Sequence, residues 1–246
     1  MRALGAAALL RLWEIEEDRL PAERALALLA ALAEGEEHLA LGTLTIGARD
    51  ARLLELRART FGSLLEAQTH CPACAEPLEF SLPLAQLLAA RCSDAAGASD
   101  RHTIEAGGWR VLFRLPLARD LVQLGTAAAG DLRRALLELC VTEVAHGAAP
   151  AALDELPQEI IAALAARMEE LDPCADIVLA LKCTGCGNAW RAPFDIVAYL
   201  WAEFGAHARR LLREVDALGR AYGWREADIL AMSSRRRRAY LELSGA

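Results

Sequence analysis

Two Cys-x-x-Cys motifs carry the strongest chemical signal in this sequence: Cys71 with Cys74, and Cys183 with Cys186. A tight turn of this kind aims backbone amides at the sulfurs and holds two thiols at about the separation of ligands around tetrahedral zinc. Four thiolates complete the shell of a structural zinc ion and leave no position for a catalytic water. The sequence therefore predicts one structural zinc with Cys71, Cys74, Cys183 and Cys186 as its ligands.

The two motifs lie more than a hundred residues apart, whereas the pairs of a compact zinc ribbon are separated by about 15–20 residues. An internal repeat offers an explanation, because a shift of 112 residues places Cys71 on Cys183 and Cys74 on Cys186. The same shift aligns Leu78 with Trp190, Leu82 with Phe194, Leu84 with Ile196 and Leu88 with Leu200. We expect two similar halves, each with a small β-hairpin bearing a zinc knuckle, packed face to face around one metal.

Two other interpretations of these thiols stay open. A thioredoxin-like redox motif belongs at a strand-to-helix junction of a βαβ unit, whereas each motif here lies between two predicted strands. The four cysteines could also be buried free thiols, since cysteine packs as a small hydrophobic residue. The total of seven cysteines is odd, which argues against a fully paired disulfide framework. We expect Cys92, Cys140 and Cys174 to pack in the interior.

The elements around the motifs predict a helix-rich α+β fold with a helical C-terminal tail. Alternating patterns predict strands at 43–46, 64–70, 78–82, 102–105, 109–115, 176–182 and 190–194. Helical patterns cover 21–33, 50–61 with Asp50 as its cap, 84–90, 120–144, 157–171, 195–222, 226–232 and 234–243.

Stretches of small residues at 91–101 and 146–152 predict linkers. These linkers and the basic character of the C-terminal residues divide the chain into a first knuckle half (1–101), a hairpin and helical connector (102–153), a second knuckle half (154–206) and a basic helical tail (207–246).

Composition excludes several classes of protein. With 246 residues, 54% of them hydrophobic, 25% charged and a net charge of −7, the chain is neither disordered nor collagen-like. The longest uninterrupted apolar run, Ala25 to Ala33, is shorter than the roughly 20 residues that a bilayer requires. The short apolar start lacks a small-residue cleavage pattern. We expect a cytoplasmic protein without a membrane partner.

No catalytic motif accompanies the cysteines. The sequence has no phosphate-binding glycine loop, no nucleophile elbow and no His-Glu-x-x-His motif. Its five histidines are scattered. We therefore expect a protein that is not an enzyme.

The C-terminal tail has a character of its own, since residues 208–246 contain nine arginines and five acidic residues. Arginine and aromatic residues are frequent anchors of protein interfaces. We therefore predict a partner-binding surface of Tyr222, Trp224, Arg235, Arg236, Arg237, Arg238 and Tyr240. A solvated arginine face is one alternative. Nucleic-acid binding through two short helices is another, which the acidic charge of the whole chain disfavours.

From Leu171 onward the sequence resembles a family encoded beside phage tails and phage-tail-like contractile injection systems. The motifs that carry this resemblance lie at Leu171–Pro173, Cys183–Gly187, Phe194–Glu203, Tyr222–Leu230 and Arg236–Leu243. More distant relatives of that family look like the baseplate hub assembly chaperones of T-even-type phages. The resemblance implies a non-enzymatic role in baseplate or hub assembly, with a baseplate, hub, spike or tube protein as partner. The alternative function is that of a zinc-ribbon module associated with nucleic acid or transcription.

Overall fold

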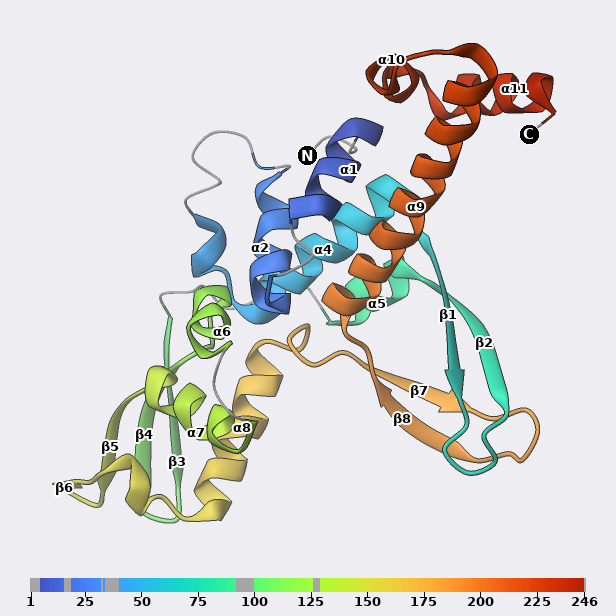
Figure 1. Ribbon diagram of the computed structural model, residues 1–246. Helices are drawn as coiled ribbons and strands as arrows, with labels where there is room; N and C mark the ends of the chain where they lie inside the picture. The colour runs from blue at the N-terminus through green and yellow to red at the C-terminus, as the bar shows by residue number, and fades with distance from the viewer. Residues whose placement is uncertain are drawn as a thin grey trace.

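A computed structural model describes residues 5–15, 19–31, 33, 40–91, 100–125 and 129–245 (Figure 1). Helices dominate it, and its strands form three small antiparallel sheets. The predicted helix-rich α+β class is therefore confirmed. Among the described helices, none is long and apolar enough to cross a bilayer.

The larger hydrophobic core lies between helices. These are α1 (Ala6–Ile15), α2 (Pro21–Ala30), α4 (Ile46–Phe61) and the first part of α9 (Ile196–Tyr222). Apolar residues recur at helical spacing along each of them, so that one side of every helix faces the core. Leu28, Leu53, Leu200 and Phe204 are each 0% exposed at its centre.

Two β-hairpins extend from this core, and their turns meet (Figure 1). The first pairs β1 (Leu64–His70) with β2 (Pro77–Pro83) and leads into α5 (Leu84–Arg91). The second pairs β7 (Val178–Lys182) with β8 (Ala189–Pro193) and leads into α9.

A second, smaller core lies under a separate sheet. Its strands are β3 (Arg101–Ala106), β4 (Trp109–Arg114), β5 (Val141–His146) and β6 (Ala149–Pro150), in the order β3-β4-β5-β6. Helix α8 (Gln158–Leu171) packs Ile160 and Leu164 against Val111 and Phe113 of β4. Helices α6 (Ala118–Leu124) and α7 (Ala129–Cys140) connect β4 to β5, and the short 3₁₀ helix η2 (Leu153–Glu155) precedes α8.

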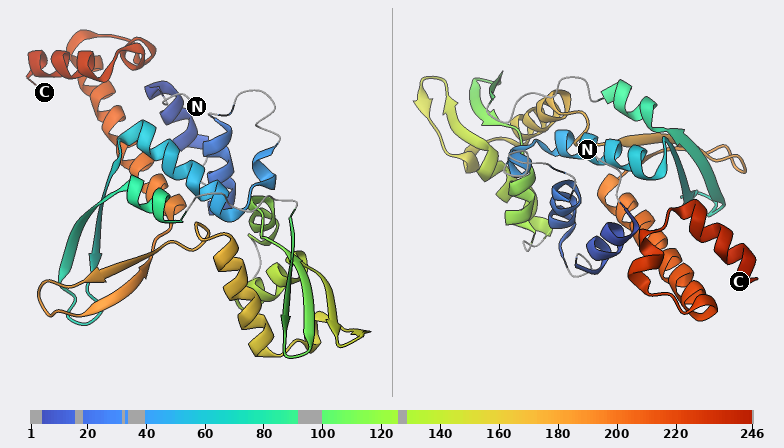
Figure 2. Two further views of the ribbon diagram at one scale, coloured as in Figure 1. Left: turned by 180° about the vertical axis from the view of Figure 1, so that it is seen from behind. Right: turned by 90° about the horizontal axis from the view of Figure 1, so that it is seen from above.

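The chain ends in two short helices, α10 (Glu226–Ala231) and α11 (Ser234–Ser244), which pack against the second part of α9. Gly223 ends α9 in the left-handed conformation, with φ of 68°. The left view in Figure 2 shows this tail at the end of α9 remote from the hairpins.

Residues 43–46 do not form the predicted strand. Thr43 is the last residue of the 3₁₀ helix η1 (Leu41–Thr43), and Ile46 is the first residue of α4. Between them, Thr45 forms an isolated β-bridge with Leu117. The predicted cap of the next helix is also wrong. Thr45 caps α4 by accepting a hydrogen bond from the Ala48 amide at 3.2 Å, whereas Asp50 lies inside the helix and is 8% exposed.

The predicted single helix 120–144 is wrong as well, because the chain forms α6 and α7 and then enters β5 at Val141. Val141 and Val144 pair with Phe113 and Val111 of β4, so tertiary pairing decides the state of this β-branched segment. The predicted linker 146–152 contains β6. Residues 92–99 of the other predicted linker lie outside the described part of the chain. The domain limits and the similarity of two halves stay predictions.

Candidate metal centre

The structure brings together the four cysteines of the two motifs. All four sulfur atoms lie within 4.8 Å of one another. Across the hairpins, the Cys71 and Cys186 sulfurs are 3.6 Å apart and those of Cys74 and Cys183 are 3.7 Å apart. Ligands on 2.3 Å bonds around a tetrahedral zinc ion are separated by about 3.8 Å. The donor set and its spacing therefore fit one tetrahedral metal ion.

The first turn is held by its own backbone. The Cys71 amide donates to the Glu76 carbonyl at 2.9 Å, and the Ala75 amide donates to the Cys71 carbonyl at 2.9 Å. The Ala73 amide points at the Cys71 sulfur, 3.4 Å away. Ala75 takes the left-handed conformation, with φ of 59°. This short loop orients both sulfurs toward the same side.

The second turn repeats this pattern at the positions that the 112-residue shift predicts. The Cys183 amide donates to the Asn188 carbonyl at 2.8 Å, and the Gly187 amide donates to the Cys183 carbonyl at 3.1 Å. Gly187 is left-handed, with φ of 76°. Strand register is also conserved by the shift, since the pair His70–Pro77 corresponds to Lys182–Ala189. The two turns are thus locally equivalent.

Contacts at the base of the first hairpin fix its direction. Leu65 is 0% exposed within the larger core. The buried Arg57 guanidinium donates to the carbonyls of Gly62 and Leu64 and forms an ion pair with Glu203 of α9 at 2.7 Å. The Tyr199 hydroxyl of α9 donates to the Glu66 carbonyl at 2.6 Å. Helix α9 therefore holds the first hairpin while it directly continues the second.

Arg57 was not among the sequence-based candidates. The signal was present, because Arg57 follows Leu53 and Leu54 on the buried face of α4, where an unpaired charge would be costly. Its partner Glu203 is 146 residues away, however, and no local pattern connects the two.

The pKa values of the Cys71 and Cys74 thiols shift in opposite directions. Burial raises the pKa of the Cys71 thiol, but hydrogen bonds from the Ala73 and Cys74 amides and from the Cys186 thiol lower it to about 6. A backbone hydrogen bond at Glu76 lowers the pKa of Cys74, whereas its contact with Cys186 and burial raise it to about 12. Neighbouring thiolates repel each other, and a divalent cation removes this repulsion because a coordinating thiol is deprotonated.

The other described cysteines lie away from this cluster, in the interior as predicted. Cys140 is 0% exposed, and burial raises the pKa of its thiol to about 11. Cys174 is 2% exposed and disulfide-bonded. The predicted place of Cys92 lies outside the described residues.

The three aromatic residues of the predicted partner surface pack on one another. The rings of Tyr222 and Trp224 stack with centroids 4.5 Å apart, and Tyr240 meets Trp224 edge-on at 4.8 Å. The Tyr222 hydroxyl also donates to the Tyr240 carbonyl at 3.2 Å. These contacts join α11 to the end of α9, so the aromatic residues stabilise the tail.

The four consecutive arginines have two different environments. Arg235, Arg236 and Arg238 are exposed on α11. Arg237 is 5% exposed, donating to Glu214 of α9 at 2.8 Å and to the Met232 carbonyl at 2.7 Å. The Arg237 side chain is therefore buried and paired within the tail, and the other three arginines of this run face solvent.

The metal cluster and the tail are separate regions. Helix α9 spans the distance between them with 27 residues, which corresponds to a length of about 40 Å. The structure therefore does not combine the cysteines and the arginines in one site.

Comparison with models of protein families, with curated proteins and with solved structures finds no match to this chain.

Proposed function

We propose that this chain is a non-enzymatic assembly factor or structural adaptor for the baseplate or hub of a phage-tail-like contractile injection system, stabilised by a four-cysteine zinc site. The observation that carries the structural part is the cluster of four sulfurs contributed by two hairpins far apart in sequence. A site that cross-links distant segments serves the architecture of the protein. The resemblance of residues 171–243 to tail-associated proteins supports the assembly role.

Cys71, Cys74, Cys183 and Cys186 would hold the metal ion. Zinc in such a shell supplies a rigid cross-link between the two turns and has no open position for a substrate. Tetrahedral sulfur sites also suit iron, so elemental analysis of the purified protein is the direct test of the metal. We expect one zinc per chain. Iron accompanied by visible absorption would contradict the zinc assignment.

The exposed face of α11 is the proposed partner surface. Arg235, Arg236 and Arg238 stand on it without burial, and the aromatic cluster beneath keeps α11 in place. Such a surface suits an acidic patch on a baseplate, hub, spike or tube protein of a cytoplasmic assembly.

Affinity purification from the native host, with mass spectrometry of the associated proteins, tests this role. The wild-type chain is compared with a triple variant in which Arg235, Arg236 and Arg238 become serine. A second triple variant, with serine at the exposed Arg110, Arg167 and Arg191, loses the same charge elsewhere. We expect tail subunits with the wild type and with the second triple variant, at a level reduced at least several-fold in the first.

Absence of any baseplate, hub, spike or tube subunit from the wild-type sample would contradict the proposal. Equal recovery with both triple variants would keep the assembly role and reject α11 as the partner surface.

The same exposed arginines are the observation that favours the second candidate, a zinc-ribbon module that binds nucleic acid. Phosphate contacts make such binding strongly dependent on salt. Micromolar binding of DNA or RNA that falls steeply from about 50 to 200 mM salt, and disappears in the α11 triple variant, would favour this candidate.

A further inference from the structure

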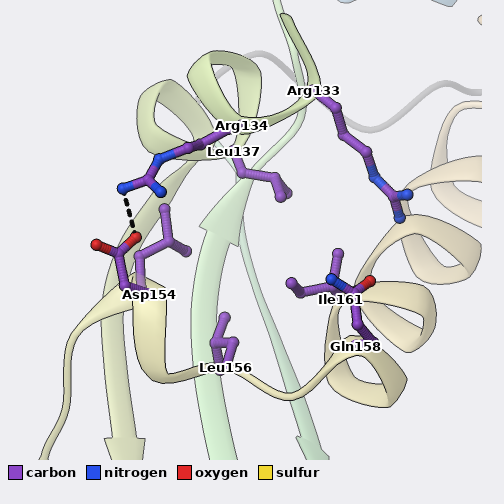
Figure 3. Close-up of a pocket in the computed structure, with 8 residues that line it drawn as sticks. Arg133, Arg134, Leu137, Asp154, Leu156, Gln158 and Ile161 are labelled. Carbon is purple, nitrogen blue, oxygen red and sulfur yellow. Dashed lines mark ion pairs between the residues drawn. The ribbon is translucent and has the colours of Figure 1, made fainter. Parts of the chain in front are cut away.

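A solvent-open cavity of about 310 Å³ lies between α7, η2 and α8, at the side of the smaller core (Figure 3). Leu137 of α7 and Ile161 of α8 point into it from opposite sides, and Leu156 forms its floor. Leu156 is buried, whereas Leu137 and Ile161 are only half-buried. The core therefore presents an apolar surface here that the described residues do not cover.

Arg133 stands at the rim of this cavity, where its side chain is exposed to solvent. Helical spacing places it in line with Leu137 and the fully buried Cys140, on the side of α7 that faces the core. In the described part of the chain, no carboxylate forms an ion pair with Arg133. Among the described residues its guanidinium therefore has no carboxylate partner, and it lies at the edge of an apolar floor.

The neighbouring Arg134 provides a contrast within the same cavity. It forms ion pairs with Asp154 at 2.6 Å and with Glu138 at 3.0 Å, as the dashed line in Figure 3 shows for Asp154. Within the described part of the chain, the cavity is therefore lined by one arginine that forms ion pairs and one that forms none.

We propose that this cavity is a docking site for a segment of a partner protein in which an apolar side chain stands next to a carboxylate. The apolar side chain fills the space between Leu137, Leu156 and Ile161, and the carboxylate pairs with Arg133. A guanidinium and a carboxylate can form two parallel charge-assisted hydrogen bonds, and this geometry makes the pair selective for a carboxylate.

The cavity has room for side chains of a polypeptide. About 310 Å³ lies at the lower end of the range for small-molecule pockets, so the space suits one or two side chains. A partner chain adds contacts along the helices on either side, as in other helix-lined grooves. The docking site depends neither on the metal nor on the arginines of α11, so its test is independent of the proposed function.

The experiment uses the full-length protein, immobilised in its metal-loaded form, and two pools of hexapeptides with random flanks. One pool has leucine followed by glutamate at its centre, and the other has leucine followed by glutamine. Bound peptides are counted by mass spectrometry. We expect about fivefold enrichment of the glutamate pool on the wild type, the size of effect that a partly exposed ion pair produces.

Two variants make the result specific. Arg133→Gln should lower the enrichment to about one, because the glutamate then has no cation to meet. Arg167→Gln removes an exposed arginine from the outer side of α8 and should leave the enrichment unchanged. Equal capture of both pools by the wild type, or equal enrichment on Arg133→Gln, would overturn the proposal.

N-acetyl-leucine serves as a competitor that has the same apolar group and carboxylate without a chain. It should displace the peptides only at concentrations well above theirs. Displacement at equal concentration would overturn the assignment of a polypeptide and assign the cavity to a small carboxylic acid.

Discussion

Ala75 and Gly187 occupy equivalent places in the two metal-binding turns, yet only one of them is glycine. Both are left-handed, with φ of 59° and 76°. A side chain in this region places its Cβ close to a backbone oxygen, which costs roughly 1–2 kcal/mol relative to glycine. The first turn therefore contains strain that the second avoids.

Exchanging these residues should change stability in opposite directions. Ala75→Gly should raise the free energy of unfolding by about 0.5–1 kcal/mol, a gain reduced by the larger entropy of glycine in the unfolded chain. Gly187→Ala should lower it by about 1–2 kcal/mol. Chemical denaturation at fixed metal concentration measures both. Gly185→Ala is the control, because its added Cβ would meet only ordinary contacts at 3.7 Å or more.

Asp50 is a second residue whose environment has a measurable consequence. Burial in α4 raises its pKa from 3.8 to about 6, against the effect of the Arg49 ion pair at 2.7 Å, while Asp195 and Asp172 raise it further. The folded state therefore binds this proton more tightly than the unfolded state. Ionisation of Asp50 opposes folding, so its contribution favours the folded state at low pH and is lost as pH rises from about 4 to 6.

Asp50→Asn should remove this contribution. The measured quantity is the free energy of unfolding of the wild type minus that of the variant. As the pH rises from 4 to 6, this difference should decrease by about 2–3 kcal/mol. Urea denaturation of both proteins across this range measures the difference, from which the shared pH dependence of metal binding cancels. A difference that does not change with pH would contradict the assigned pKa.

At the scale of elements, α9 has two separate tasks. Its first half contributes Leu200 and Phe204 to the larger core and continues the second hairpin. Its second half supports the tail, where Glu214 forms an ion pair with Arg237, and Tyr240 of α11 packs edge-on against Tyr222 and Trp224. The four clustered cysteines all precede α9, so the tail is not needed to bring them together.

Truncation after Gly223 should therefore leave one metal ion per chain and abolish capture of the partner. Stability should decrease by a few kcal/mol, because the removal of α10 and α11 exposes Leu218 and takes away the buried Ile229. Elemental analysis and circular dichroism of the truncated chain measure both effects. Loss of the metal would show that the tail belongs to the core.

Asp172 links the two cores of the molecule at the level of elements. It ends α8, and its carboxylate accepts a hydrogen bond from the Gly47 amide in the first turn of α4 at 2.8 Å. A Cβ on residue 47 would come within 2.0 Å of this carboxylate. Only glycine permits this approach. The contact therefore joins the start of α4 to the end of α8, although the two residues are 125 positions apart in the sequence.

At the scale of the whole molecule, a metal ion held by the four cysteines would close a long loop. It would add a cross-link between the tips of the two hairpins, which extend from different parts of the chain. Closing a loop of more than a hundred residues restricts the unfolded chain, and structural zinc sites contribute apparent binding free energies on the order of 10 kcal/mol. The metal should therefore govern both stability and the relative position of the hairpins.

Replacement of Cys71 and Cys183 by serine should abolish metal binding and lower the melting temperature. In this variant, amide hydrogen exchange should speed up more in residues 64–83 and 178–193 than in the larger core. The reason is that Leu65 and Ile177 anchor only the bases of the two hairpins. Cys140→Ser is the control, since this buried cysteine is not in the cluster. An unchanged melting temperature in the double variant would refute a stabilising role for the metal.

The local part of the candidate site was predictable from the sequence. A Cys-x-x-Cys pair between two alternating segments specifies a hairpin turn by short-range geometry, and the 112-residue shift correctly relates the registers of the two hairpins. The strand at Val141 was not predictable in this way. Its apolar pattern suits a helix equally well, and pairing with β4 decides between the two.

The sequence by itself determined the candidate ligand residues, the two turns and the helix-rich class, because each depends on contacts within a few positions along the chain. Only the tertiary structure decided that the four sulfurs meet, that Arg237 turns inward to Glu214, and that Arg133 stands over an open apolar floor. Each of these depends on a partner element far away in the chain, and its position results from the packing of the whole molecule.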